Sequence, residues 1–229
     1  MSANKPTGQI GPVKVQRTTV AVTSSWDKVH FPAEKTEIEK AIVEYFVRTM
    51  SKHGATILAA QANDEANHDF TLQLPGGRTY LELTELQYRD GPGRPYDSRS
   101  QRISTFTYAE QIAGAVQRKA ERYGRAGSVP IHLLLYITHW RFLPNEIAIR
   151  LAQHLLLTRP PLFENVFLLW PTDEKDATVR VLFPADNPLE GHAADEFREH
   201  TYLNLDPAGW RVVPGTSVAE GPPPSPASA

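Results

Sequence analysis

Two acidic residues, Asp69 and Glu82, have the types and the spacing that metal-assisted chemistry requires. Each lies in a stretch predicted to be a strand, at residues 68–74 and 78–88, and a tight turn at 75–77 joins the two stretches. Because side chains alternate between the two faces of a strand, a short hairpin can bring both carboxylates to one end of a sheet on the same side. Two such carboxylates are the minimum oxygen set for holding Mg²⁺ against a phosphate.

The elements around this hairpin are predicted from apolar spacing. A first helix begins after Pro32 and ends at Gly54, which suits a left-handed cap. A short strand is expected over residues 55–60, before the hairpin. After the hairpin, an apolar stripe at helical spacing predicts a second helix over residues 108–123, and the uninterrupted apolar run 131–138 predicts a strand buried on both faces.

The remaining pattern completes the predicted fold class. A third helix is expected from Pro144, followed by strands over residues 166–170 and 178–183. A strand–helix–strand crossover after an antiparallel meander gives a mixed sheet. We therefore predict an α/β fold with a mixed central sheet flanked by helices, an αβββαβ core and a C-terminal αβ extension.

Composition sets limits on function. Of the 229 residues, 41% are hydrophobic and 22% are charged, as in ordinary soluble domains. We expect a flexible arm over residues 1–31, a single α/β domain over 32–213 and a disordered tail rich in proline, alanine and serine over 214–229. The absence of cysteine excludes disulfides and thiolate zinc sites and is compatible with a cytoplasmic location. The net charge of -2 means that a nucleic-acid ligand would need a local basic patch.

The order αβββαβ, with acids at the second and third strands, resembles the PD-(D/E)XK, or restriction-endonuclease-like, nuclease superfamily over residues 34–138. In this resemblance His68 and Asp69 take the place of the Pro-Asp motif, and Glu82-Leu83-Thr84 takes the place of (D/E)XK.

The resemblance implies a Mg²⁺ or Mn²⁺ ion held by Asp69, by Glu82 and by the main-chain carbonyl of Leu83. A glutamate of the first helix often joins such a site, and Glu39, or Glu37 one face away, is the candidate.

Thr84 stands where the superfamily has a lysine that orients the attacking water. Lysine supplies a positive charge that stabilises the developing charge on phosphorus, whereas threonine supplies only a hydroxyl. Two explanations stay open. Lys119, in the second helix, can supply the missing cation to a catalytic set of Asp69, Glu82 and Thr84, or the site has lost catalysis.

Polar and basic residues follow the hairpin and line the second helix, where guanidinium groups could reach phosphates. The candidates for contact with nucleic acid, DNA first, are Arg89, Arg94, Arg99, Arg102, Gln111 and Arg122. Many members of the superfamily are dimers, so the resemblance allows a homodimer without identifying its face.

The sequence is therefore compatible with three functions. The first is a Mg²⁺-dependent nuclease that acts on DNA, possessing full or weakened activity. The second is a catalytically inactive module of the same fold that binds nucleic acid or a protein partner. The third is an unrelated α/β hydrolase or transferase. A Mg²⁺ or Mn²⁺ titration tests whether the site binds metal, and a structure with Asp69 and Glu82 on opposite faces of the sheet would favour the third.

Overall fold

The protein is a mixed α/β structure built on one central sheet. The computed structural model describes residues 8–17, 22–63, 68–89, 102–123 and 129–209. Six strands form the sheet in the order β3-β4-β5-β7-β8-β9. Its strands are β3 (Ala59–Ala62), β4 (Phe70–Leu74), β5 (Gly77–Glu85), β7 (Ile131–Tyr136), β8 (Asn165–Pro171) and β9 (Ala177–Phe183).

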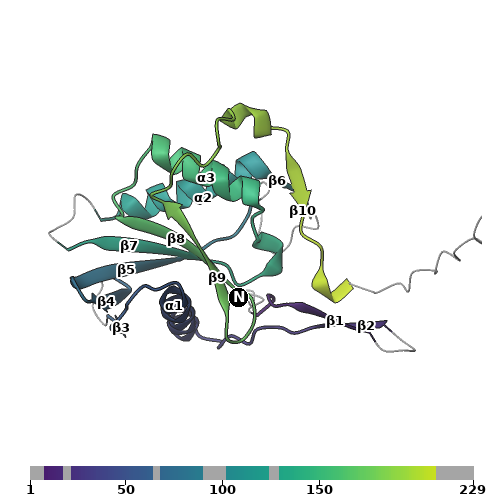
Figure 1. Cartoon of the computed structure of the whole chain (residues 1–229), viewed down its shortest axis with the longest axis horizontal. Coiled ribbons are helices and arrows are strands. Elements are labelled where there is room, and N and C mark those ends of the chain that lie inside the picture. The colour runs from purple at the N-terminus through teal and green to yellow at the C-terminus, as the bar shows by residue number, and fades with distance from the viewer. Residues whose placement is uncertain (1–7, 18–21, 64–67, 90–101, 124–128, 210–229) are drawn as a thin grey trace, which may run out of the picture.

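Three helices cover this sheet. They are α1 (Lys35–Lys52), α2 (Thr105–Ala120) and α3 (Glu146–Thr158). Figure 1 shows α2 and α3 side by side on one face of the sheet and α1 on the other. The predicted order of helix, three strands, helix and strand is confirmed by the sequence of α1, β3, β4, β5, α2 and β7, with one additional short strand, β6 (Arg102–Ser104), before α2.

The pairing of strands follows from the connections between them. The strands β3, β4 and β5 are antiparallel neighbours, and a tight turn joins β4 to β5. The strand β7 is parallel to β5 because the chain crosses over through α2 before it returns to the sheet, and β8 is parallel to β7 for the same reason through α3. The last strand, β9, is antiparallel to β8. The sheet is thus mixed, as predicted.

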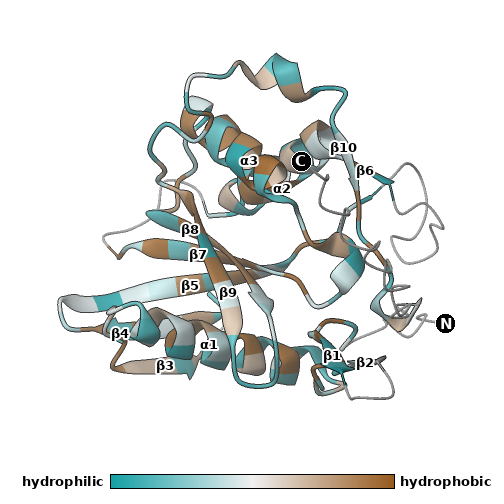
Figure 2. Ribbon diagram, turned by 45° about the vertical axis from the view of Figure 1, so that its right-hand side comes forward, coloured by the Kyte–Doolittle hydropathy of each residue, from teal (hydrophilic) through white to brown (hydrophobic). Residues whose placement is uncertain are grey.

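The core lies between the two helical layers. Every residue of β7 is buried, which confirms the expectation drawn from its uninterrupted apolar run. The central strand β8 is buried along most of its length. Figure 2 shows hydrophobic stretches concentrated in the central strands, while the helices are banded in both colours because each buries only one stripe.

Local chemistry fixes the ends of the elements. The helix α1 ends at Lys52, and Gly54 follows it with φ +86°, the left-handed conformation that favours glycine. The helix α2 begins three residues earlier than predicted because the Ser104 side chain accepts a hydrogen bond from the N–H of Thr107. The predicted strand at 55–60 is displaced to Ala59–Ala62, where its backbone pairs with β4.

The N-terminal region differs from the flexible arm that was expected over residues 1–31. The strands β1 (Val13–Arg17) and β2 (Val22–Trp26) pair as an antiparallel hairpin. Ile10 and Val29, which flank the hairpin, are both 2% exposed and belong to the core. The burial of these apolar side chains stabilises the region, although its glycine and proline residues indicate a loop. The predicted tail at 214–229 lies outside the described residues.

Two further features complete the description. The short strand β10 (Thr201–Leu203) pairs antiparallel with β6, so a late segment of the chain lies beside the start of α2. No helix in the described part of the chain combines the length and the apolar character needed to cross a bilayer.

Candidate functional site

Asp69 and Glu82 lie opposite each other in the β4–β5 hairpin. The last registered pair of the ladder is Phe70 with Leu81, so Asp69, one residue before β4, faces Glu82. Residues opposite each other in an antiparallel pair point to the same face. The hairpin therefore brings the two carboxylates to one end of the sheet, as predicted from the sequence.

Beyond this point β5 continues without β4 beside it. The N–H of Leu83 donates a hydrogen bond of 2.7 Å to Oδ2 of Asp69, and the carbonyl of Leu83 accepts one of 3.2 Å from Nζ of Lys119. Buried main-chain groups need partners, and here side chains replace the missing strand. The edge of β5 thereby becomes part of a polar site.

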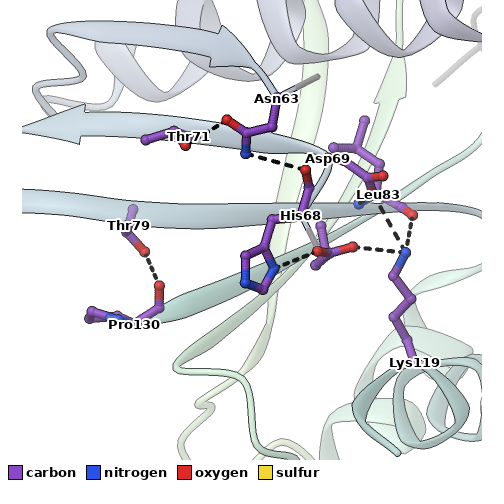
Figure 3. Close-up of polar contacts among 9 residues, drawn as sticks. Asn63, His68, Asp69, Thr71, Thr79, Leu83, Lys119 and Pro130 are labelled. Carbon is purple, nitrogen blue, oxygen red and sulfur yellow. Dashed lines mark hydrogen bonds and ion pairs between the residues drawn. The ribbon is translucent and has the colours of Figure 1, made fainter. Parts of the chain in front are cut away.

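Lys119 is the centre of that site (Figure 3). Its Nζ lies 2.9 Å from Oε2 of Glu82 and 3.5 Å from Oδ2 of Asp69, besides its hydrogen bond to the carbonyl of Leu83. An ammonium group thus has three oxygens around it, two from β5 and one from the residue before β4. The expectation that Lys119 supplies the cation near the two acids agrees with this geometry.

Glu82 is the most enclosed member of the site, with 1% of its side chain exposed. Its Oε1 lies 2.8 Å from Nδ1 of His68, whose ring stacks on Tyr80 at a centroid distance of 4.1 Å. The ring of Tyr123 stacks on the same histidine at 5.3 Å. Burial, followed by the neighbouring Glu82 carboxylate, raises the pKa of the Tyr123 hydroxyl.

The segment before β4 is held in place by its own polar contacts. The side-chain amide of Asn63 donates to the carbonyl oxygen of His68, and the hydroxyl of Thr71 donates to the side-chain oxygen of Asn63 (Figure 3). The N–H of Asn63 donates to the carbonyl of Asp69. These contacts fix the backbone of His68 and Asp69, so both side chains are positioned by the fold.

The oxygens around Lys119 have the chemistry of a site for a hard divalent cation. Oε2 of Glu82 is buried and lies 2.9 Å from the ammonium of Lys119, so a metal ion at this oxygen would take the place of that ammonium. Among the described residues, no three histidine or acidic side chains gather as a metal site. A metal at this site would instead be held by two carboxylates, of Asp69 and Glu82, and by the Leu83 carbonyl. Such a small set of protein ligands suits Mg²⁺, because this ion keeps several waters.

A cavity of about 320 Å³ lies beside these oxygens. Four of its lining residues are basic, namely Lys35, Arg118, Lys119 and Arg122, and two are acidic, Glu39 and Glu85. Thr84 and Leu83 line it from β5, and Glu39 lines it from α1. The cavity thus joins both helical layers at the free edge of β5 and favours an anionic ligand.

Glu39 and Glu37 have different environments on α1. Glu39 has 11% of its side chain exposed and pairs with Lys35 at 3.1 Å inside the cavity wall. Glu37 pairs with Lys40 at 2.7 Å and is half exposed. Of the two helix candidates, the structure places Glu39 beside the cavity and leaves Glu37 on the outer surface.

The predicted nucleic-acid contacts are dispersed. Arg122 lines the cavity. Gln111 uses its amide on the backbone of Arg89, accepting from its N–H at 2.8 Å and donating to its carbonyl at 2.7 Å. Arg102 is exposed on β6, away from this set of contacts. Arg94 and Arg99 lie outside the described residues.

Sequence reasoning did not assign a role at this site to Tyr123, Arg118 or Lys35. A signal was present in the helical spacing, since Tyr123 follows Lys119 by four residues and Arg122 follows Arg118 by four. Lys119 and Arg118 lie in the last turn of α2, and Tyr123 and Arg122 lie in the turn that follows it.

No protein-family model matches the chain, and no curated protein matches it. Among solved structures, the chain is similar to SfsA from Pyrococcus furiosus in complex with Ca²⁺. The two are 10% identical with a TM-score of 0.30, over 70% of this chain and 75% of that one. A similarity of this size assigns neither a fold family nor a function.

Proposed function

We propose that this protein is a divalent-metal-dependent phosphodiesterase of the PD-(D/E)XK type that acts on nucleic acid, with DNA as the expected substrate. The observation that supports it is the convergence of Asp69, Glu82 and the Leu83 carbonyl on one cationic group beside a basic cavity. These are the positions that the resemblance assigns to the metal ligands. Mg²⁺ or Mn²⁺ held there would activate water and neutralise the phosphate under attack.

The chain's own residues have separate tasks in this proposal. Arg118 and Arg122 bind the phosphate through their guanidinium groups on the cavity wall. His68 holds the Glu82 carboxylate in one orientation through its contact of 2.8 Å. Thr84 lines the cavity and has a hydroxyl that can orient water, while Lys119 supplies the positive charge that the residue at position 84 lacks.

A nicking assay on supercoiled plasmid with Mg²⁺ or Mn²⁺ tests this function. We expect metal-dependent nicking that falls at least about 100-fold in Asp69→Asn and in Glu82→Gln, since each loses a ligand charge that acts on the transition state. Glu37→Gln, an outward carboxylate on α1, is the matched control and should retain the wild-type rate. Equal rates in wild type and in both site variants would reject the proposal.

A second function, a catalytically inactive binding module, is favoured by one observation. The ammonium of Lys119 contacts both Asp69 and Glu82 and offsets one of their two negative charges, so part of the charge at the site is compensated without a metal. This alternative predicts no metal-dependent nicking by wild type. It also predicts binding of fluorescent DNA that weakens in Arg118→Glu and Arg122→Glu and falls steeply with salt. Binding that ignores salt would favour a protein partner instead.

A further inference from the structure

We propose that Lys119 is an exchangeable internal cation, which occupies the oxygens of the metal site until a phosphate in the neighbouring cavity draws its ammonium away. The inference rests on the proposed function and adds its regulation: the site loads a divalent ion and a phosphate-bearing ligand together. It concerns the order of binding, which the ligand set alone does not determine.

The first step is that the ammonium and a metal exclude each other. The Nζ of Lys119 contacts Oε2 of Glu82, Oδ2 of Asp69 and the carbonyl oxygen of Leu83, within 2.9 to 3.5 Å. These are the same three groups that would hold Mg²⁺. Two cations at one set of oxygens repel strongly in a partly buried site, so one of them must leave.

The second step concerns the side chain that leaves. Lysine carries its charge on a flexible four-carbon stem, so the ammonium can move while the helix stays in place. Only 14% of the Lys119 side chain is exposed, and the cavity of about 320 Å³ is the space that it borders. The ammonium therefore has an adjacent volume to enter.

The third step is the charge of that volume. Besides Lys119, the charged residues that line the cavity are Arg118, Arg122 and Lys35 against Glu39 and Glu85, so the basic residues outnumber the acidic ones. Within the cavity wall the recorded acidic partner of Lys35 is Glu39, at 3.1 Å. A further cation entering this space is repelled unless an anion is present. A phosphate bound by the arginines would attract the Lys119 ammonium into the cavity instead of repelling it. The phosphate thereby favours the movement of Lys119 and, through it, the binding of the metal.

The test is a titration with Mn²⁺, followed by electron paramagnetic resonance, on wild type and on Lys119→Met without nucleotide. We expect Lys119→Met to bind Mn²⁺ at least tenfold more tightly, since the competing cation is gone. Lys52→Met removes a lysine that pairs with Asp176 far from the site in sequence and should bind Mn²⁺ like wild type. Equal affinities in wild type and Lys119→Met would overturn the inference.

A second measurement uses a ligand with a single phosphodiester. The dinucleotide thymidylyl-thymidine should tighten Mn²⁺ binding by wild type at least tenfold, and its uncharged methylphosphonate analogue should not. In Lys119→Met this gain should be at least threefold smaller than in wild type. A gain of the same size in both proteins would overturn the inference.

The removal of Lys119 leaves Glu82 buried beside fewer partners, so folding is checked first by circular dichroism. If Lys119→Met does not fold, Lys119→Gln takes its place, and if neither folds, the two dinucleotides on wild type decide. Equal Mn²⁺ affinities with both would then overturn the inference. Plasmid nicking that requires Asp69, together with unchanged Mn²⁺ affinity in Lys119→Met, overturns this inference alone. Absence of Mn²⁺ binding by every protein, with and without nucleotide, overturns the proposed function as well.

Discussion

Glu82 is completely buried and contacts an ammonium group, the kind of partner that a buried carboxylate needs. It lies at the centre of β5, with 0% of the residue exposed. Its two oxygens are divided between His68 and Lys119, at 2.8 and 2.9 Å. The removal of one member of a buried ion pair leaves the other uncompensated, and this costs more than the loss of a surface pair. The residue therefore has a structural role besides any chemistry.

We expect Glu82→Gln to lower the free energy of unfolding by about 3 kcal/mol, the lower end for breaking a buried pair, because Asp69 still neighbours Lys119. Urea denaturation at pH 7.5 measures this change. Glu37→Gln breaks an exposed pair with Lys40 and should cost less than about 1 kcal/mol. Equal losses in the two variants would show that the Glu82 contacts contribute little to stability.

At the residue scale, sequence predicted the acids better than their partners. The short hairpin fixes Asp69 opposite Glu82, and this relation follows from the turn and the strand period alone. Lys119 was recognised as a candidate from its type, but its distance from Glu82 depends on how α2 packs after the crossover. Tyr123 was missed because a tyrosine near a helix end is indistinguishable from ordinary core packing in the sequence.

At the element scale, α3 illustrates how a single side chain starts a helix. Asn145 precedes the helix in an extended conformation, and its side-chain oxygen accepts a hydrogen bond of 2.8 Å from the N–H of Ala148. This contact satisfies one of the N–H groups that a first turn leaves unpaired. Because α3 packs against α2, which carries Lys119, the start of α3 supports the site indirectly.

We expect Asn145→Ala to lower the free energy of unfolding by about 1 kcal/mol, since alanine offers no acceptor for Ala148. Asn145→Asp keeps the acceptor and should recover most of the loss. Chemical denaturation of wild type and the two variants measures the effect, provided that the free energy of unfolding has the same dependence on denaturant concentration in all three. An aspartate variant as unstable as the alanine variant would show that the side-chain acceptor is not what stabilises the helix.

Some elements were predicted correctly and others were missed. The difference depends on how far apart in the sequence the residues lie whose contacts form each element. The run 131–138 needs no partner to be recognised as a buried strand, and β7 forms there at Ile131–Tyr136. The strands β6 and β10 are three residues each and exist only because they pair with each other across a long stretch of chain. Local patterns do not encode such a pairing.

At the scale of the whole molecule, two buried histidines make stability depend on pH. Burial, assisted by Arg141, lowers the pKa of His139 to about 4, and burial lowers the pKa of His132. The Nδ1 atom of His139 accepts a hydrogen bond of 3.1 Å from the N–H of Arg141, so the neutral ring is the form that fits. An unfolded histidine titrates near pH 6.5, so the unfolded chain binds more protons at mildly acidic pH.

The contribution of His139 is therefore fully present above about pH 6.5 and is lost progressively as the pH falls toward 4, by up to about 1.4 kcal/mol per pH unit, and that of His132 is lost in the same direction. Urea denaturation at pH 7.5, 6 and 5 measures this slope. His139→Gln removes one titrating group and should give a shallower dependence on pH in this window than wild type. Identical slopes in the two proteins would contradict the assignment to His139.

The pairing of β6 with β10 has a consequence for how the protein can be divided. The N–H of Thr105, at the first residue of α2, donates to the carbonyl of His200, and the Thr105 hydroxyl lies 2.7 Å from Nδ1 of the same histidine. The opposite end of this helix carries Lys119. A fragment that stops before residue 200 would contain every side chain of the site and yet lack the attachment that sets where the helix begins.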